Sequence, residues 1–97
     1  MNNIEFKLEV YADIKVAYVW YESQRVGLGE DFLLTLEESY SKITRTPKLY
    51  QDIYKTVRRK LVRRFPYGIY FVIREDIIIV IAVLHTKREP QEWHKRV

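Results

Sequence analysis

The spacing of hydrophobic residues changes along this chain and divides it into strand-like and helix-like parts. Between residues 3 and 10, apolar side chains alternate with charged ones, at Ile4, Phe6, Leu8 and Val10. Alternation with a period of two predicts a β-strand over residues 3–10 with one buried face. Residues 12–24 contain no Gly or Pro, and apolar residues recur there at helical spacing, at Ile14, Ala17, Tyr18 and Tyr21. This second pattern predicts a first α-helix.

A second helix is predicted directly after the first. Gly27-Leu28-Gly29 can form a tight corner, because glycine adopts positive φ without steric cost. Acidic residues then suit the positive end of a helix dipole. Helical spacing continues through Phe32, Leu36, Tyr40 and Ile43. It ends before Pro47, because proline cannot extend a helix. Because the connection is so short, the two helices should form an antiparallel pair.

The chain after Pro47 has the composition of β-structure. Strand-like sequence resumes near Tyr54, and polar residues on both faces of residues 57–64 predict a strand that borders solvent. Residues 67–74 and 77–84 are rich in β-branched and aromatic side chains, and the two residues between them give hairpin spacing. Residues 77–84 do not alternate, which predicts a central strand covered by the helices on one face and by a tail or a partner on the other.

These elements together predict an α+β fold in the order strand, helix, helix, strand, strand, strand. The helical hairpin should pack on one face of a mainly antiparallel sheet. A chain of 97 residues is too short for two independent cores, so we expect one domain spanning residues 1–97.

Composition excludes several classes of site and location. The chain has no Cys and only two His residues, so it offers no disulfide and no credible metal site. It also lacks a Gly-rich phosphate loop, and we expect no metal and no cofactor. The N-terminal residues do not resemble a secretory signal, and the longest apolar run is too short to span a bilayer. We therefore expect a cytoplasmic protein with no membrane partner.

Charge is distributed unevenly. Residues 1–54 contain 6 Lys and Arg against 9 Asp and Glu, whereas residues 55–97 contain 11 against 4. The basic half points to a polyanion or an acidic protein as partner. The residues that we expect to contact such a target are Arg58, Arg59, Lys60, Arg63, Arg64, Lys87, Arg88, Trp93 and Arg96. Alternatively, residues 58–64 form only a solvated edge strand or a docking face for a partner protein, and Trp93 folds back on the sheet.

Motifs along most of the chain resemble the RelE/ParE superfamily of type II toxins. They occur in the family's order: Asp13-Ile14, Trp20-Tyr21-Glu22, Gly27-Leu28-Gly29 with Phe32, Pro47, Arg64-Phe65-Pro66-Tyr67-Gly68-Ile69-Tyr70, His85, Arg88-Glu89-Pro90 and Trp93. The resemblance implies a protein that arrests growth until a cognate antitoxin neutralises it. RelE-like members cleave messenger RNA on the ribosome, and ParE-like members poison DNA gyrase.

The family's nuclease pattern is incomplete here. It has lysines on the second strand, an arginine entering the third strand, an arginine after the fourth and a C-terminal tyrosine. Gly68 stands in place of the third-strand arginine and Trp93 in place of the tyrosine, so we favour a ParE-like or other non-nuclease toxin. If the chain is a RelE-like endoribonuclease, Arg58, Arg59 and Arg88 would hold phosphate and His85 would be its acid or base. A third hypothesis is a nucleic-acid-binding module without toxicity, and His85 could simply cap the last strand.

Overall fold

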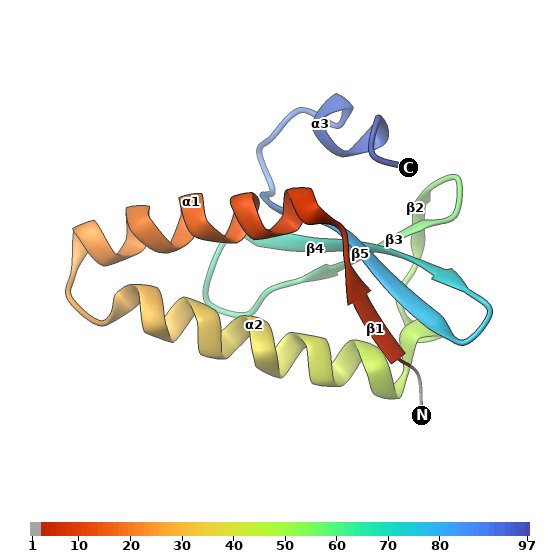
Figure 1. The fold of residues 1–97 in the computed structure, drawn as a ribbon, viewed down its shortest axis with the longest axis horizontal. Coiled ribbons are helices and arrows are strands. Elements are labelled where there is room, and N and C mark those ends of the chain that lie inside the picture. Colours follow the sequence, from red (N-terminus) through yellow and green to blue (C-terminus); the bar gives the residue numbers. More distant parts are fainter. Residues whose placement is uncertain (1–2) are drawn as a thin grey trace.

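The computed structural model describes residues 3–97, which form two long helices and a mixed sheet (Figure 1). The elements follow one another in the order β1 (Asn3–Phe6), α1 (Leu8–Gln24), α2 (Leu28–Arg45), the 3₁₀ turn η1 (Pro47–Leu49), β2 (Asp52–Tyr54), β3 (Val57–Leu61), β4 (Tyr67–Arg74), β5 (Ile77–His85) and α3 (Gln91–His94). No helix among the described residues is long and apolar enough to cross a membrane.

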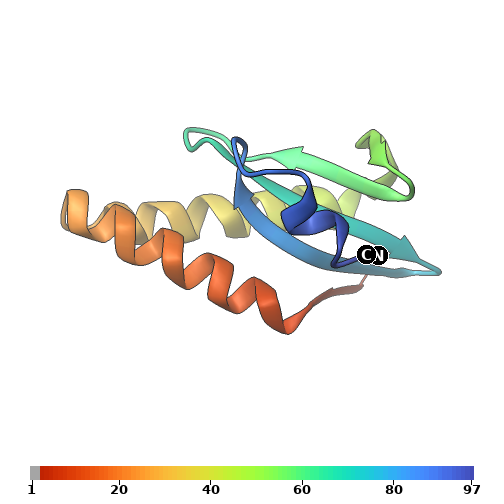
Figure 2. The same ribbon diagram turned by 90° about the horizontal axis from the view of Figure 1, so that it is seen from above.

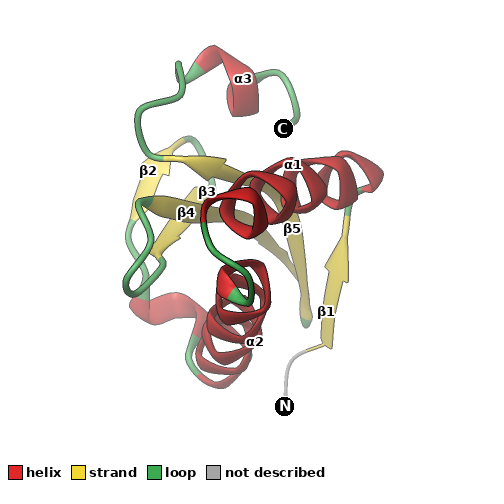
Figure 3. Cartoon of the chain, turned by 90° about the vertical axis from the view of Figure 1, so that its left-hand side faces the viewer, coloured by secondary structure: helices red, strands yellow, loops and turns green. Residues whose placement is uncertain are grey.

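The elements form three layers. The sheet has the strand order β1-β5-β4-β3-β2, in which β1 is parallel to β5 and every other pair is antiparallel. The antiparallel pair α1 and α2 covers one face, and the short α3 lies over the opposite face (Figures 2 and 3). The predicted α+β class, with a helical hairpin on one face of a mainly antiparallel sheet, is confirmed.

The first strand is shorter than predicted, and the helix begins earlier. The last ladder bond of β1 runs from the Lys7 N–H to the Val80 carbonyl, at 3.0 Å, and α1 starts at Leu8. Leu8 is 84% exposed, whereas Val10 is buried on the same helix face as Ala17 and Tyr21. The alternation over residues 3–10 was therefore misleading, because Val10 also satisfies the helical spacing of the residues that follow it.

Gly27 and Gly29 make the corner between the helices, as predicted. Gly27 adopts φ of 91°, the left-handed region that favours glycine. The Glu22 carboxylate accepts the N–H groups of Gly27 and Gly29, at 2.9 and 3.0 Å, and so satisfies two donors at the start of α2. A Cβ on Gly29 would lie 2.8 Å from the Tyr18 ring, so the residue must be small. In Trp20-Tyr21-Glu22, Glu22 therefore caps the start of α2, and Tyr21 belongs to the hydrophobic core.

The basic strand predicted over residues 57–64 is also shorter, and β2 is an additional strand beside it. β3 ends at Leu61, and β2 pairs with it through Asp52 and Tyr54, so β2 is the edge of the sheet. The remaining residues form a turn in which Arg64 has φ of 75°. Val62 and Phe65 bury their side chains in the helix-side core and end the strand's alternation.

β5 is central in the packing, as predicted. Its residues contribute to both hydrophobic clusters, one beneath α1 and α2 and the other beneath Trp93 of α3. Its side chains alternate between the two faces, and a β-bulge interrupts this alternation once: Tyr70 pairs with Ala82 and Phe71 pairs with Val80, which leaves Ile81 as an extra residue. Ile81 and Ala82 consequently face the same cluster. The C-terminal tail therefore covers the second face, which is one of the two alternatives left open by the sequence.

An ion pair completes the edge of β5 where β1 has ended. The Val83 N–H donates to Asp13 Oδ2 at 3.0 Å, and Arg96 donates to the Ile81 carbonyl at 3.1 Å. Arg96 also holds Asp13 through two bonds of 2.6 and 3.1 Å, with side-chain exposures of only 16% and 7%. The Asp13 carboxylate raises the pKa of Arg96. This pair connects α1, β5 and the C-terminal tail.

Replacing Leu36 with Ala should destabilise the fold by ~2–5 kcal/mol, because the side chain is 1% exposed and its removal leaves a cavity between α2 and the sheet. Chemical denaturation followed by circular dichroism measures this change. Leu34, which is 62% exposed on the same helix, is the matched control, and Leu34→Ala should change stability by less than ~0.5 kcal/mol. Equal effects of the two substitutions would contradict this assignment of the core.

Replacing Arg96 with Ala should cost ~3–5 kcal/mol, because the largely buried Asp13 carboxylate loses its cation and the Ile81 carbonyl loses a donor. Denaturant titration measures the loss. The control is Arg63→Ala, which breaks an ion pair with side-chain exposures of 62% and 45% and should cost less than ~1 kcal/mol. A similar small loss for both variants would mean that the Asp13–Arg96 pair does not anchor the tail.

Candidate interaction surface

The outer face of α1 leaves large apolar side chains in solvent. Val16, Val19 and Trp20 are 68%, 56% and 56% exposed, and together with Lys15 and Ser23 they line a shallow hollow. A surface helix of a soluble protein normally has a polar outer face, whereas α1 is apolar on both sides. Contiguous apolar side chains of this kind mark an interaction site.

A groove extends from this apolar face toward the end of β5. Val16 and Trp20 form one wall, and Pro66, Tyr67 and His85 form the other. Past His85 the groove continues to Asp13 and Arg88. We call this feature the α1 groove. Burial raises the pKa of the Tyr67 phenol, so this side chain is a neutral aromatic wall at physiological pH.

His85 is held by a local hydrogen bond at the polar end of the groove. The Lys87 N–H donates to His85 Nδ1 at 3.1 Å, and the ring packs edge-on against Tyr67 with centroids 5.4 Å apart. A ring that accepts at Nδ1 carries the hydrogen of its neutral form on Nε2. The donor that this tautomer of His85 offers is therefore Nε2–H, and the backbone contact at Nδ1 closes the end of β5.

The space of the missing third-strand arginine is filled by Arg59. A Cβ on Gly68 would lie 3.1 Å from Arg59 Cδ and 3.2 Å from Tyr70 Cε1. Trp93, which stands in place of the family tyrosine, is 6% exposed and stacks on Tyr70 with centroids 4.8 Å apart. Trp93 thus folds back on the sheet.

His85, Arg88 and Arg59, three residues of the predicted nuclease set, are not in one place. His85 and Arg88 line the same end of the α1 groove. Arg59 pairs with Tyr70 in the sheet register, on the face covered by Trp93, and therefore lies on the side of the sheet opposite the helices. Arg88 forms an ion pair with Glu92 and lowers the pKa of that carboxyl group.

The other cations predicted on β3 lie on the helix side of the sheet. Arg58 donates to the Lys48 and Tyr50 carbonyls, at 3.3 and 2.5 Å, and pairs with Asp52 at 3.3 Å. Its guanidinium therefore fastens η1 to the sheet. Lys60 Nζ lies 5.4 Å from the centroid of the Tyr50 ring.

The remaining predicted cations have different surroundings. Arg63 pairs with Glu38 at 3.1 Å and Arg64 approaches Asp31 at 3.8 Å, so both face carboxylates of α2. Arg96 is committed to Asp13, as described above. Lys87 is exposed, and its ammonium has no ion-pair partner within residues 3–97. The predicted basic surface is thus divided between two faces and several ion pairs.

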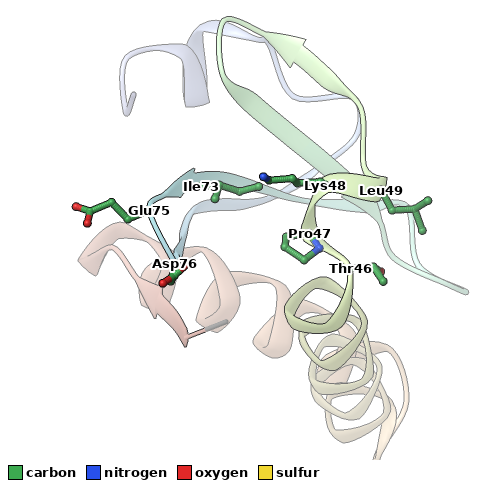
Figure 4. Close-up of a pocket in the computed structure, with 7 residues that line it drawn as sticks. All are labelled: Thr46, Pro47, Lys48, Leu49, Ile73, Glu75 and Asp76. Atoms are coloured by element: carbon green, nitrogen blue, oxygen red, sulfur yellow. The ribbon is translucent and has the colours of Figure 1, made fainter. Parts of the chain in front are cut away.

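Another hollow lies at the opposite end of the molecule, between the end of α2 and the turn that joins β4 to β5 (Figure 4). Its lining combines apolar Pro47, Leu49 and Ile73 with Thr46, Lys48, Glu75 and Asp76. None of these is a predicted site residue. Residues 3–97 contain no cluster of three or more His, Asp or Glu side chains that could hold a metal ion.

Sequence reasoning missed the α1 groove. A signal was present, since Val16, Val19 and Trp20 are apolar although they fall outside the predicted buried stripe of the first helix. An apolar residue away from that stripe predicts either a wider core or an interface, and only the position of the sheet decides between the two.

Similarity to known proteins is found in both the sequence and the fold of the chain. No curated protein matches the chain. Among solved structures, a chain of the chromosomal ParDE toxin–antitoxin system from P. aeruginosa has the same fold, with a TM-score of 0.78 at 13% identity, covering 88% of this chain and 96% of the other. The sequence model of the protein family described as the ParE toxin of the type II toxin–antitoxin system parDE matches residues 4–90. Because this match spans nearly the whole sequence, the chain belongs to the ParE toxin family of type II toxin–antitoxin systems.

Proposed function

We propose that this ParE-family chain arrests growth by binding DNA gyrase, without nuclease activity. The observation that carries the proposal is the family match over residues 4–90, together with the dispersed nuclease set. RNA cleavage by 2′-hydroxyl attack needs an acid, a base and cations around one phosphate. Here His85 and Arg59 lie on opposite faces of the sheet, and the Nδ1 atom of His85 is occupied by a backbone N–H.

We also propose that the α1 groove receives the antitoxin. Membership of a toxin–antitoxin family implies an antitoxin partner. The α1 groove is a surface that places aromatic and branched side chains beside polar ones, Trp20 and Val16 next to His85 and Arg88. An amphipathic helix with an apolar stripe and an acidic end would match both halves of the groove. Charge complementarity with the basic chain should make association fast and salt-sensitive.

The proposed mode of action predicts a particular response to substitution. His85→Ala should leave growth arrest and inhibition of gyrase supercoiling within about threefold of the unmodified chain, because the imidazole moves no proton in this mechanism. Arg59→Ala with Arg88→Ala should weaken inhibition and reduce its salt dependence, because two cations of the predicted target-binding set are removed. Gyrase assays on supercoiled DNA and cleavage assays on programmed ribosomes, run with each folded variant, measure these effects.

The opposite result would support the RelE-like hypothesis. For a nuclease, His85→Ala should lower messenger RNA cleavage by ~10²–10⁴-fold while ribosome binding persists. If the unmodified chain cleaves messenger RNA on programmed ribosomes and has no effect on gyrase, the proposed gyrase target is wrong. A chain that binds nucleic acid but affects neither system would favour the non-toxic binding module.

The docking proposal predicts that Trp20→Glu weakens antitoxin binding by at least ~30-fold, the effect of losing an aromatic anchor. The toxin should stay folded, since Trp20 is 56% exposed, and it should remain toxic when the antitoxin is co-expressed. The matched control is Leu34→Glu, which introduces the same charge at a 62% exposed position of α2 that does not line the groove. Calorimetry with the cognate antitoxin measures the difference, and equal losses in both variants would place the antitoxin elsewhere.

A further inference from the structure

The fold gathers basic side chains at a place that the sequence did not indicate. Lys42 and Arg45 extend from the last turn of α2 and, with Thr46, Leu49 and Tyr50, line a shallow hollow. Lys60 of β3 reaches the same place, with its ammonium 5.4 Å from the centroid of the Tyr50 ring. We call Lys42, Arg45 and Lys60 the α2 basic patch. It shares no lining residue with the α1 groove.

The charged side chains of α2 change from acidic to basic along the helix. Nearer its start, Asp31 faces Arg64, and in the middle Glu38 faces Arg63, at 3.8 and 3.1 Å. One turn further, the charged residue of α2 is Lys42 instead of a carboxylate, and Lys42 lines the same hollow as Tyr50, the ring beside Lys60. Burial and then the Lys42 charge lower the pKa of Lys60, while Glu38 acts in the other direction.

This arrangement is not explained by the structure of the chain itself. The negative end of the α2 dipole favours cations in its last turn, which accounts for Lys42 and Arg45. It does not account for a third cation, Lys60, beside the same hollow, because like charges destabilise each other. Neither Lys42 nor Arg45 forms an ion pair or side-chain hydrogen bond within residues 3–97, and Glu38 is already held by Arg63. An external anion would neutralise all three.

We propose that the α2 basic patch binds the phosphate backbone of duplex DNA. Phosphates are contacted mainly by Lys and Arg side chains without base recognition, as a cluster of flexible cations allows. A protein partner would instead be expected to bury an apolar centre depleted of charge. Here Lys42 and Arg45 line the hollow and Lys60 lies beside it, and its large apolar side chains are limited to Leu49, which also lines the hollow of Figure 4, and Tyr50.

Arg58 supports this surface without belonging to it. Its guanidinium is committed to Asp52 and to the Tyr50 carbonyl, which fixes the backbone of Tyr50 against β3. The Tyr50 ring in turn packs on Phe71 at 6.0 Å and carries Lys60 above it. Lys60 is therefore held near the end of α2, which lowers the entropy cost of bringing the three cations to adjacent phosphates.

The test is fluorescence anisotropy with a labelled 20-base-pair duplex and the purified full chain, titrated at several KCl concentrations. Three phosphate contacts predict a slope of log affinity against log salt of about −2.7. The variant K42A/R45A/K60A should bind at least ~10-fold more weakly at 50 mM salt, with a slope close to zero. The control K55A/R74A/K95A removes the same charge from exposed positions elsewhere and should lose less than about threefold.

Each alternative has its own outcome. Equal loss in the two triple variants would mean that net charge, and not the patch, attracts DNA, and would overturn the proposal. If poly-glutamate at equal charge concentration displaces the DNA, the patch would be reassigned to an acidic protein. Stronger binding of poly-glutamate than of DNA would lead to the same conclusion. Circular dichroism shows whether each variant is folded. If the triple variant is unfolded, K42Q/R45Q replaces it, because this variant changes only two exposed side chains. Unchanged DNA binding by this milder variant would also overturn the proposal.

Discussion

β5 is the strand on which every other layer of this protein depends, and it has to be covered on all sides. Its residues are buried on both faces, so helices are needed on one side and a further layer on the other. Its edge is covered by β1 only as far as Val80. Beyond that point, Asp13 accepts the Val83 N–H and Arg96 donates to Ile81, so side chains replace the missing strand. The helical hairpin, the tail and the first strand are therefore held by one element.

The order and type of the main elements could be predicted because each carries a long, consistent pattern. Helical spacing from Ile14 onward and the apolar run of residues 77–84 are such patterns. The errors lie where two patterns overlap or where only a few residues decide. Val10 fits both a strand and a helix, β2 has three residues, and the bulge at Ile81 depends on pairing that no local pattern contains. The position of Trp93 also depends on long-range packing, against Tyr70.

The candidate site was harder to predict than the fold, because a sequence gives charges without their neighbours. Residues of the same type have different surroundings here: Arg96 completes a strand edge, Arg63 faces a carboxylate, and Arg59 fills the space above a glycine. Lys42 and Arg45 lie in the half of the chain that is acidic overall, so the distribution of charge along the sequence does not indicate a binding site there. They become part of a basic surface only when α2 places them beside β3.

The separation of the two proposed surfaces has a consequence for inhibition. The α1 groove is formed by α1 and the end of β5, whereas the α2 basic patch lies at the end of α2, and no residue lines both. An antitoxin confined to the groove would leave the patch exposed, so the neutralised toxin could still contact DNA through its cations. An antitoxin that continues along α2 with an acidic segment would close both surfaces. The salt dependence of DNA binding by the complex, compared with that of the toxin alone, distinguishes these arrangements because only the first preserves the phosphate contacts.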